Sequence, residues 1–238
     1  MIRNRLFARN LSGRTIHAGF LRAMRDTSGL ALIEFAFVAP ILLLLGMAGM
    51  ELANFAIVKM RLSQAAVHIS DNVSRVGDRD ILAAQKIYES DLNDLFIGVN
   101  LQAGNALDIF EHGRIIVSSL EQNADGGQWI AWQRCKGKKT FVSRYGPAGT
   151  GETGTAFAGM GRTGEEVTAS PGTAVMFVEI SYTYQPLVVN GFTRQFVEPF
   201  EMSSSAAFNV RNSRDLTGIF QTSPASPVAD CTTYDGIS

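Results

Sequence analysis

The sequence predicts an α+β protein in which a long N-terminal apolar helix precedes a second helix and a mainly antiparallel β-sheet. Three observations lead to this fold class. Residues 28–45, SGLALIEFAFVAPILLLL, open the longest apolar stretch of the chain. An amphipathic helical pattern then continues to about residue 76. The alternation of apolar and polar residues that is typical of strands begins only at residue 113.

The composition suits a folded protein with an anchor. The chain has 238 residues, of which 46% are hydrophobic and 18% are charged. The first 25 residues contain six arginines and no acid, whereas residues 30–238 contain 15 Lys/Arg and 21 Asp/Glu, a net charge of −6. This asymmetry is typical of a cytoplasmic basic end followed by a translocated body. The sequence has no basic stripe with interleaved aromatic residues, so nothing supports a nucleic-acid partner.

Residues 30–50 are predicted to cross a membrane as a helix, with residues 1–29 as a basic cytoplasmic leader. The 21 residues from Leu30 to Met50 have Glu34 as their only charge. As a helix they span about 31 Å at about 1.5 Å per residue, which matches a bilayer core. A carboxylate in such a segment destabilises the inserted helix by several kcal/mol unless it has a partner. We therefore expect Glu34 to have a functional role.

Three interpretations of this segment remain open. The first is an uncleaved signal anchor. The second is a cleaved secretory signal, with Phe35–Leu45 as its apolar region and Gly46-Met47-Ala48 as the small-residue cleavage site. In the third, a cut after Gly29 makes Leu30 the new N-terminus and Glu34 the fifth residue of the helix. This third arrangement resembles that of type IV prepilins, in which the acid can pair with the new α-amino group of a neighbouring subunit.

Residues 51–98 are predicted to contain an amphipathic stalk helix and a second helix. Phe55, Leu62, Ile69 and Val76 recur every seven residues, and Val58, Ala66 and Val73 fill the same apolar stripe. The stripe either forms a free stalk or packs on the following domain. The second helix is expected to begin near Asp78 or Asp80 and to end at Gly98.

Residues 113–212 are predicted to form a β-rich domain in the translocated part of the chain. GRIIVSSL and GQWIAWQRC flank an Asp-Gly turn and predict a hairpin, with Trp129 and Trp132 on opposite faces of a regular strand. Residues 145–173, with eight glycines, are expected to form a mobile surface loop that can contact a partner. In residues 174–188, Met176, Val178, Ile180, Tyr182 and Tyr184 share one face of a strand. A further strand or pair of strands is expected within 196–210, broken at Pro199.

Residues 213–238 form a polar tail with little to pack. The two cysteines, Cys135 and Cys231, lie in no CxxC motif. An even count in an exported chain favours a disulfide, which would tie this tail to the domain and stabilise it by about 3–5 kcal/mol.

The chain resembles the TadE-like family, the small pseudopilin-like proteins of tight-adherence (Flp) pilus assembly. The resemblance is carried by GLALIEFAFVAPILLLLGMAGMEL at the anchor, RIIVSSLE and WIAWQRC in the middle, and VEISYTYQPLV near the end. It covers roughly residues 25–215. The related TadG-like proteins carry a D-x-S-x-S metal motif, which is absent from this sequence.

The resemblance implies a pilin-like fold and processing by a prepilin peptidase. Gly29 would be the residue before the cut, Leu30 the residue after it, and Glu34 the acid of the processing signal. It also implies a bacterial inner-membrane protein with its N-terminus in the cytoplasm and its C-terminal domain in the periplasm. The partners would be the pilus assembly platform and other pilin-like subunits.

The sequence favours a structural protein over an enzyme. His17, His68 and His112 belong to no HExxH motif, no GxSxG motif occurs, and nothing implies a cofactor or a metal site. The alternative function is a secreted or membrane-tethered binding domain that recognises a ligand through its glycine-rich loop. Cleavage after Gly29 favours the pilus role, whereas cleavage near Ala48 favours the binding domain.

Overall fold

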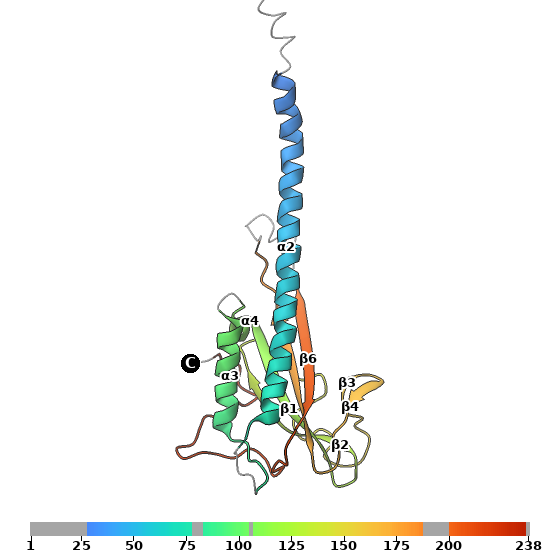
Figure 1. Ribbon diagram of the computed structural model, residues 1–238. Coiled ribbons are helices and arrows are strands. Elements are labelled where there is room, and N and C mark those ends of the chain that lie inside the picture. Colours follow the sequence, from blue (N-terminus) through green and yellow to red (C-terminus); the bar gives the residue numbers. More distant parts are fainter. Residues whose placement is uncertain (1–27, 78–82, 105–106, 188–199, 237–238) are drawn as a thin grey trace, which may run out of the picture. The chain divides into compact units, whose positions relative to one another are not determined.

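The computed structural model describes residues 28–77, 83–104, 107–187 and 200–236. The chain divides into two compact units, Met1–Met50 and Glu51–Ser238. The predicted fold class is confirmed: a long N-terminal helix and a second helix precede an antiparallel sheet, as the element order in Figure 1 shows.

The first unit contains the N-terminal part of helix α2 (Ser28–Arg75). Pro40 lies inside this helix, and every side chain from Gly29 to Met50 except the half-buried Ala39 is exposed. The most apolar 18-residue window has a mean hydropathy of 2.4, and none of it is buried. By length and composition this helix can therefore cross a membrane.

In the second unit, the same helix is amphipathic and buries one stripe. Val58, Leu62, Ala66, Ile69 and Val73 are buried in the main core, and Phe55 and Val76 pack against it. The predicted stripe is thus confirmed, because an apolar residue every three or four positions returns to the same helix face. Of the two alternatives, the structure supports packing on the domain for residues 58–73.

A four-stranded antiparallel sheet forms the centre of this unit. Its strands are β1 (Gly113–Gln122), β2 (Gln128–Lys136), β5 (Ala174–Thr183) and β6 (Glu201–Asn209), in the order β2-β1-β5-β6. The predicted hairpin is β1–β2. The strand predicted in 196–210 is β6, and residues 188–199, including Pro199, lie outside the described residues.

The two faces of the sheet bury different partners. On one face Met176, Val178, Ile180, Tyr182 and Tyr184 join α2 and α3 (Glu89–Ala103) in the main core, as the alternation in β5 predicts. On the other face a smaller core contains the buried side chains Leu120, Ile130, Met160, Ala169, Val175 and Phe177. The central strands β1 and β5 are therefore buried on both faces.

The prediction that Trp129 and Trp132 lie on opposite faces is wrong. Trp132 pairs with Ser119, but Trp129 pairs with Glu121, because the register of the hairpin shifts by one residue between Ser119 and Leu120. Residues directly opposite in an antiparallel pair share a face, so both tryptophans lie on the same face. A β-bulge thus overrides the odd spacing.

The predicted bounds of the second helix are also wrong. Helix α3 begins at Glu89, and residues 85–88 are extended instead, with bridges from Gln85 to Arg214 and from Tyr88 to Phe220. Gly98 lies within the helix, which ends before Gly104 at a positive φ of 71°. The predicted caps Asp78 and Asp80 lie outside the described residues.

The glycine-rich segment 145–173 has more structure than a plain loop. It contains the two-stranded sheet of β3 (Met160–Arg162) and β4 (Glu165–Val167). Tyr145 and Phe157 pack against the smaller core, in which Met160 and Ala169 are buried. The segment therefore covers the face of the sheet that is opposite the helices.

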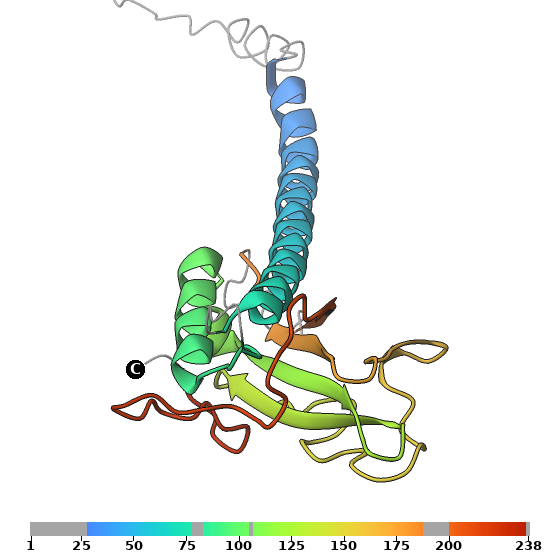
Figure 2. The ribbon, with the colours of Figure 1, turned by 60° about the horizontal axis from the view of Figure 1, so that its bottom comes forward.

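The C-terminal tail is part of the fold, contrary to the expectation that it has little to pack. Phe220 exchanges backbone hydrogen bonds with Ile87 and Glu89, and Asn93 Nδ2 donates to Pro227 O at 2.7 Å. Farther along, Cys135 N donates to Ala229 O at 2.9 Å. The tail thus runs past α3 and reaches the outer edge of β2 (Figure 2, red).

A short helix, α4 (Ile109–His112), leads into β1.

Candidate functional site

The predicted processing residues lie in the first turns of α2. Gly29 follows the first helical residue, and a side chain built on it would meet no atom within 4 Å. Leu30 is 58% exposed, and Glu34 is also exposed. Within the described residues, Glu34 has no hydrogen-bond or ion-pair partner. Its carboxylate is thus open to a group from another molecule.

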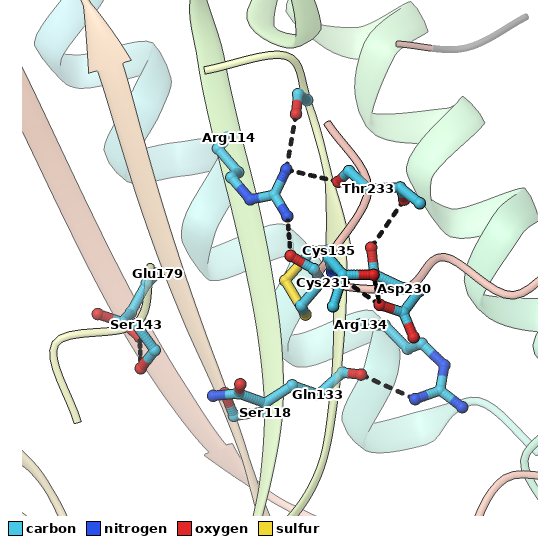
Figure 3. The surroundings of a disulfide bond; sticks show 12 residues. Arg114, Ser118, Gln133, Arg134, Cys135, Ser143, Glu179, Asp230, Cys231 and Thr233 are labelled. Carbon is cyan, nitrogen blue, oxygen red and sulfur yellow. Dashed lines mark hydrogen bonds between the residues drawn. A yellow bond between two sulfur atoms is a disulfide. The ribbon is translucent and has the colours of Figure 1, made fainter. Parts of the chain in front are cut away.

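The two cysteines meet at the β2 edge. The structure joins Cys135 and Cys231 in a disulfide with their Cα atoms 4.7 Å apart, 96 residues apart in sequence. Figure 3 shows this bond between β2 and the tail. Oxidation of the pair in the cell stays a prediction. In this geometry the disulfide bond fastens the tail to the β1–β2 hairpin.

Arg114 holds the same tail from the neighbouring strand β1. Its Nη1 donates to Gly137 O and Thr233 O, both at 2.9 Å, and its Nη2 donates to Cys231 O at 2.7 Å (Figure 3). The guanidinium also lies 4.0 Å from the ring centre of Tyr234. Burial lowers the pKa of this arginine, while Tyr234 and Asp235 act in the opposite direction. Among the described residues, no carboxylate accepts a hydrogen bond from it. It binds the tail through backbone carbonyls.

A buried ion pair connects α3 to the hairpin. Glu89, the first residue of α3, is 2% exposed and accepts hydrogen bonds from Arg134 of β2, with Nε at 2.9 Å from Oε2. The Arg134 Nη2 group contacts the other carboxylate oxygen. A carboxylate at a helix N-terminus also interacts favourably with the helix dipole. The pair therefore fixes the start of α3 on the sheet.

A second buried acid lies under the glycine-rich segment. Glu179 of β5 accepts a hydrogen bond from Ser143 Oγ at 2.6 Å and one from Arg144 N at 3.2 Å. Burial raises the pKa of Glu179, and these two hydrogen bonds and the Arg144 charge partly oppose that shift. The contact is visible at the left of Figure 3 and holds the start of the segment on the sheet.

Arg214 of the tail reaches the last turn of α2. Its Nη2 donates to Val73 O at 3.0 Å and to Val76 O at 2.5 Å, which satisfies carbonyls that the helix end leaves free. Burial lowers its pKa to about 10, while Glu121 acts in the opposite direction. Its Nε and Nη1 atoms are buried without a hydrogen-bond partner among the described residues.

The helices of the second unit leave a groove between α2 and α3. One part encloses about 570 Å³ and is lined by residues that include Asn72, Arg75, Asp91 and Asp94. A neighbouring part of about 380 Å³ is lined by residues that include Arg61 and Gln102. Both are open and mixed in charge, and neither holds a nucleophile beside a base.

The described histidines and the adjacent acids Glu165 and Glu166 lie on separate elements. His68 is exposed on α2, and His112 ends α4 with its ring 6.5 Å from that of Tyr182. Glu165 and Glu166 lie on the small strand β4. Among the described residues, no three His, Cys, Asp or Glu side chains gather closely enough to hold a metal ion. His17 lies outside the described residues.

Sequence reasoning missed the residues that fasten the tail and the helix ends. Arg114 offers the clearest signal, since it is a charged residue at the start of an apolar strand, where a buried cation needs hydrogen-bond acceptors. Tyr184, directly after β5, lies on the face that the alternation predicts, but its hydroxyl partner, Glu51, is 133 residues away in sequence. Neither partner set can be read from local spacing.

The comparisons with known proteins point to one family. A family model described as TadE-like protein matches residues 29–67. This match confirms the resemblance noted in the sequence, over the apolar segment and the first part of the amphipathic helix. No curated protein and no solved structure matches the chain.

Proposed function

We propose that this chain is a membrane-anchored, pseudopilin-like protein that takes part in assembly of a tight-adherence (Flp, type IVb-like) pilus. The observation that carries the proposal is the TadE-like match, which begins at Gly29 and includes Glu34. The exposed apolar helix supports a membrane anchor. The basic leader before it supports a cytoplasmic N-terminus and a periplasmic C-terminal domain.

The proposed processing step is cleavage of the peptide bond between Gly29 and Leu30 by a prepilin peptidase. Glu34 then has two tasks: recognition by the peptidase and neutralisation of the α-amino group of a neighbouring subunit. Two opposite charges in a low-dielectric environment stabilise each other only when they meet, which makes such a pair specific. The exposed carboxylate of Glu34 is compatible with both tasks.

The proposed partners are the inner membrane, the prepilin peptidase, the assembly platform and other pilin-like subunits. The proposed role is structural, without catalysis. The tail fastened by Cys135–Cys231 suits an oxidising periplasm, where disulfides persist.

The decisive experiment is intact-mass and N-terminal analysis of the membrane-extracted protein, with and without its prepilin peptidase. A peptidase-dependent start at Leu30 supports the proposal. A start at Met1 in both strains means a simple signal anchor, and a start near Gly49 means a secreted binding domain. Either of the last two results overturns the processing step.

Glu34→Gln tests both tasks of the acid together. We expect slow processing after Gly29 and loss of pili, because the amide lacks the charge that an α-amino group needs. Glu152→Gln removes an exposed acid outside the anchor and is the matched control. Normal processing and normal pili in Glu34→Gln would exclude both tasks.

A further inference from the structure

The first residue of the second unit, Glu51, is held by a motif from the far end of the sheet. Its Oε1 accepts a hydrogen bond from Tyr184 Oη at 2.5 Å, and its Oε2 accepts one from Leu187 N at 3.0 Å. Asn54 Nδ2 donates to the same tyrosine hydroxyl at 2.8 Å. The segment Tyr184–Leu187 therefore fastens the helix one residue after the predicted span ends at Met50.

Large apolar side chains surround this contact but remain exposed. Leu52 is 69% exposed, Leu187 is 63% exposed and Phe200 is 55% exposed. The Phe55 ring lies 5.5 Å from the rings of both Tyr184 and Phe200, with edge-to-face geometry. We call Leu52, Leu187 and Phe200 the apolar collar. Three such side chains around one carboxylate leave apolar surface that water solvates poorly.

The chain itself limits how far the collar can lie from the bilayer core. Leu52 is two residues beyond Met50, so at most about 7 Å of backbone separates them. In helical geometry Phe55 lies about 7.5 Å beyond Met50. The interfacial layer of each leaflet is about 5–7 Å thick. Leu52 therefore lies within this layer and Phe55 lies at its outer boundary. Leu187 and Phe200 contact Glu51 and Phe55, so they are held close to that boundary.

The hydrogen bonds of Glu51 make this position tolerable for a charge. A carboxylate at the edge of the hydrocarbon loses water, and protein donors must replace it. Burial, and then the hydrogen bond to Glu51, raise the pKa of Tyr184 to about 12. The hydroxyl therefore keeps its proton and remains a donor at neutral pH.

We propose that the apolar collar rests in the interfacial layer of the bilayer and that the Glu51–Tyr184–Leu187 contact holds it there. The occupant is lipid, because the collar lies within a few residues of the end of the predicted span. The inference rests on the proposed membrane anchor and adds a second, peripheral membrane contact. It gives the Tyr-x-Tyr-x-Pro-Leu motif a task in positioning the domain against the membrane.

The test uses the full-length protein in liposomes of phosphatidylethanolamine and phosphatidylglycerol, without other proteins. Single cysteines at Leu187→Cys and Phe200→Cys carry an environment-sensitive fluorophore, attached without reductant so that Cys135–Cys231 stays intact. Lipids with a nitroxide near the headgroup act as the quencher. Val142→Cys and Leu101→Cys, at exposed residues outside the collar, are the matched controls.

We expect the labels at Leu187 and Phe200 to lose most of their fluorescence, while those at Val142 and Leu101 keep theirs. Equal fluorescence at all four sites overturns the collar, provided that alkaline extraction leaves the protein in the membrane. Extraction of the protein by alkali shows instead that the anchor itself has failed. A different outcome is that the fluorophores enter an apolar environment as protein density rises, without quenching by the nitroxide lipids. That result indicates that a second copy of the protein covers the collar, and it overturns the assignment to lipid.

The role of the hydrogen bonds has its own control two residues earlier in the chain. Tyr184→Phe removes the hydroxyl that donates to Glu51, whereas Tyr182→Phe removes a hydroxyl that donates to Leu107 O at 2.8 Å, away from Glu51. Loss of quenching at Leu187 in Tyr184→Phe alone supports the proposed contact. Equal loss in both variants, with circular dichroism unchanged, excludes it.

Discussion

Helix α2 has two environments within one element. Leu43, in the first unit, is 66% exposed, whereas Leu62, in the second unit, is fully buried. Before Met50 apolar residues surround the helix on all sides, and after Glu51 the buried apolar residues lie on one stripe. Residue type and secondary structure are the same in both parts, so the arrangement of apolar residues around the axis makes the difference.

This comparison separates two sources of stability. The stripe after Glu51 gains its free energy from packing inside the protein. The apolar surface before Met50 gains nothing within the described residues, and under the proposed function lipid covers it. A substitution after Glu51 is therefore expected to change the stability of the domain but not membrane integration. A substitution before Met50 is expected to do the reverse.

The largest expected effect lies wholly within the second unit. The double substitution of Cys135 and Cys231 by serine removes a loop closure of 96 residues, which is expected to cost about 4–5 kcal/mol in a chain-entropy estimate. The measurement is urea unfolding of the full-length protein in detergent micelles. Membrane integration should be unchanged. Unaltered unfolding would mean that the two cysteines do not pair in the cell.

The next effect tests the two parts of α2 directly. Leu62→Ala opens a cavity in the core and is expected to lower the free energy of unfolding by about 2–5 kcal/mol. Leu43→Ala, the matched control in the same helix, is expected to leave domain unfolding unchanged. Similar losses in both variants would contradict the division of the helix.

A charge in the first unit should act on insertion only. Leu43→Arg places a cation near the centre of the predicted span, at a cost of about 2.5–3.5 kcal/mol on insertion scales. Alkaline extraction of membranes measures the loss of integration. Met60→Arg, at an exposed position of the second unit, is the control. Equal extraction of the two variants would show that residues 30–50 do not span the bilayer.

The smallest effect is a change in pH dependence. Because burial raises the folded-state pKa of Glu179 above its ordinary value of 4.5, the stability it contributes is fully present below that value. That stability is lost as pH rises through the folded pKa. Relative to Glu179→Gln, the wild-type protein should therefore lose stability between acidic and neutral pH. Parallel pH profiles in urea unfolding would contradict this. Burial also raises the pKa of Glu121, so some slope should remain in the variant.

Periodic patterns predicted the regular parts of this fold well. The stripe of α2 and the inward face of β5 follow from spacings of seven and of two, which geometry converts directly into faces. The β1–β2 hairpin follows from the Asp-Gly turn. Each of these signals is local, so residues close together in the sequence are enough to predict these elements.

Features that depend on distant partners could not be predicted in this way. Residues 85–88 are extended because the tail pairs with them, more than 120 residues later in sequence. The tryptophans share a face because the hairpin contains a bulge, which no local pattern marks. The polar tail is captured by Arg114, and its own composition gives no sign of that contact.

The candidate site also contains residues that local patterns predict and residues whose contacts depend on distant partners. The proposed processing residues Gly29 and Glu34 are recognisable from their spacing alone, because a peptidase would read such a signal along the chain. The partners of Glu51 are recognisable only after folding, because Tyr184 and Leu187 approach it from the far end of the sheet.

The link between Cys135 and Cys231 also has a mechanical consequence. Helices α2 and α3 and strand β1 all precede Cys135, so they lie outside the covalent loop of 96 residues. If a growing filament pulls on the N-terminal helix while the far end of the chain is held, the force can extend only the residues outside this loop. About 330 Å of contour length, at about 3.5 Å per residue, then stays out of reach of the tension. Under such a force the elements before Cys135 can unfold, while β5 and β6 stay inside the loop that the disulfide closes.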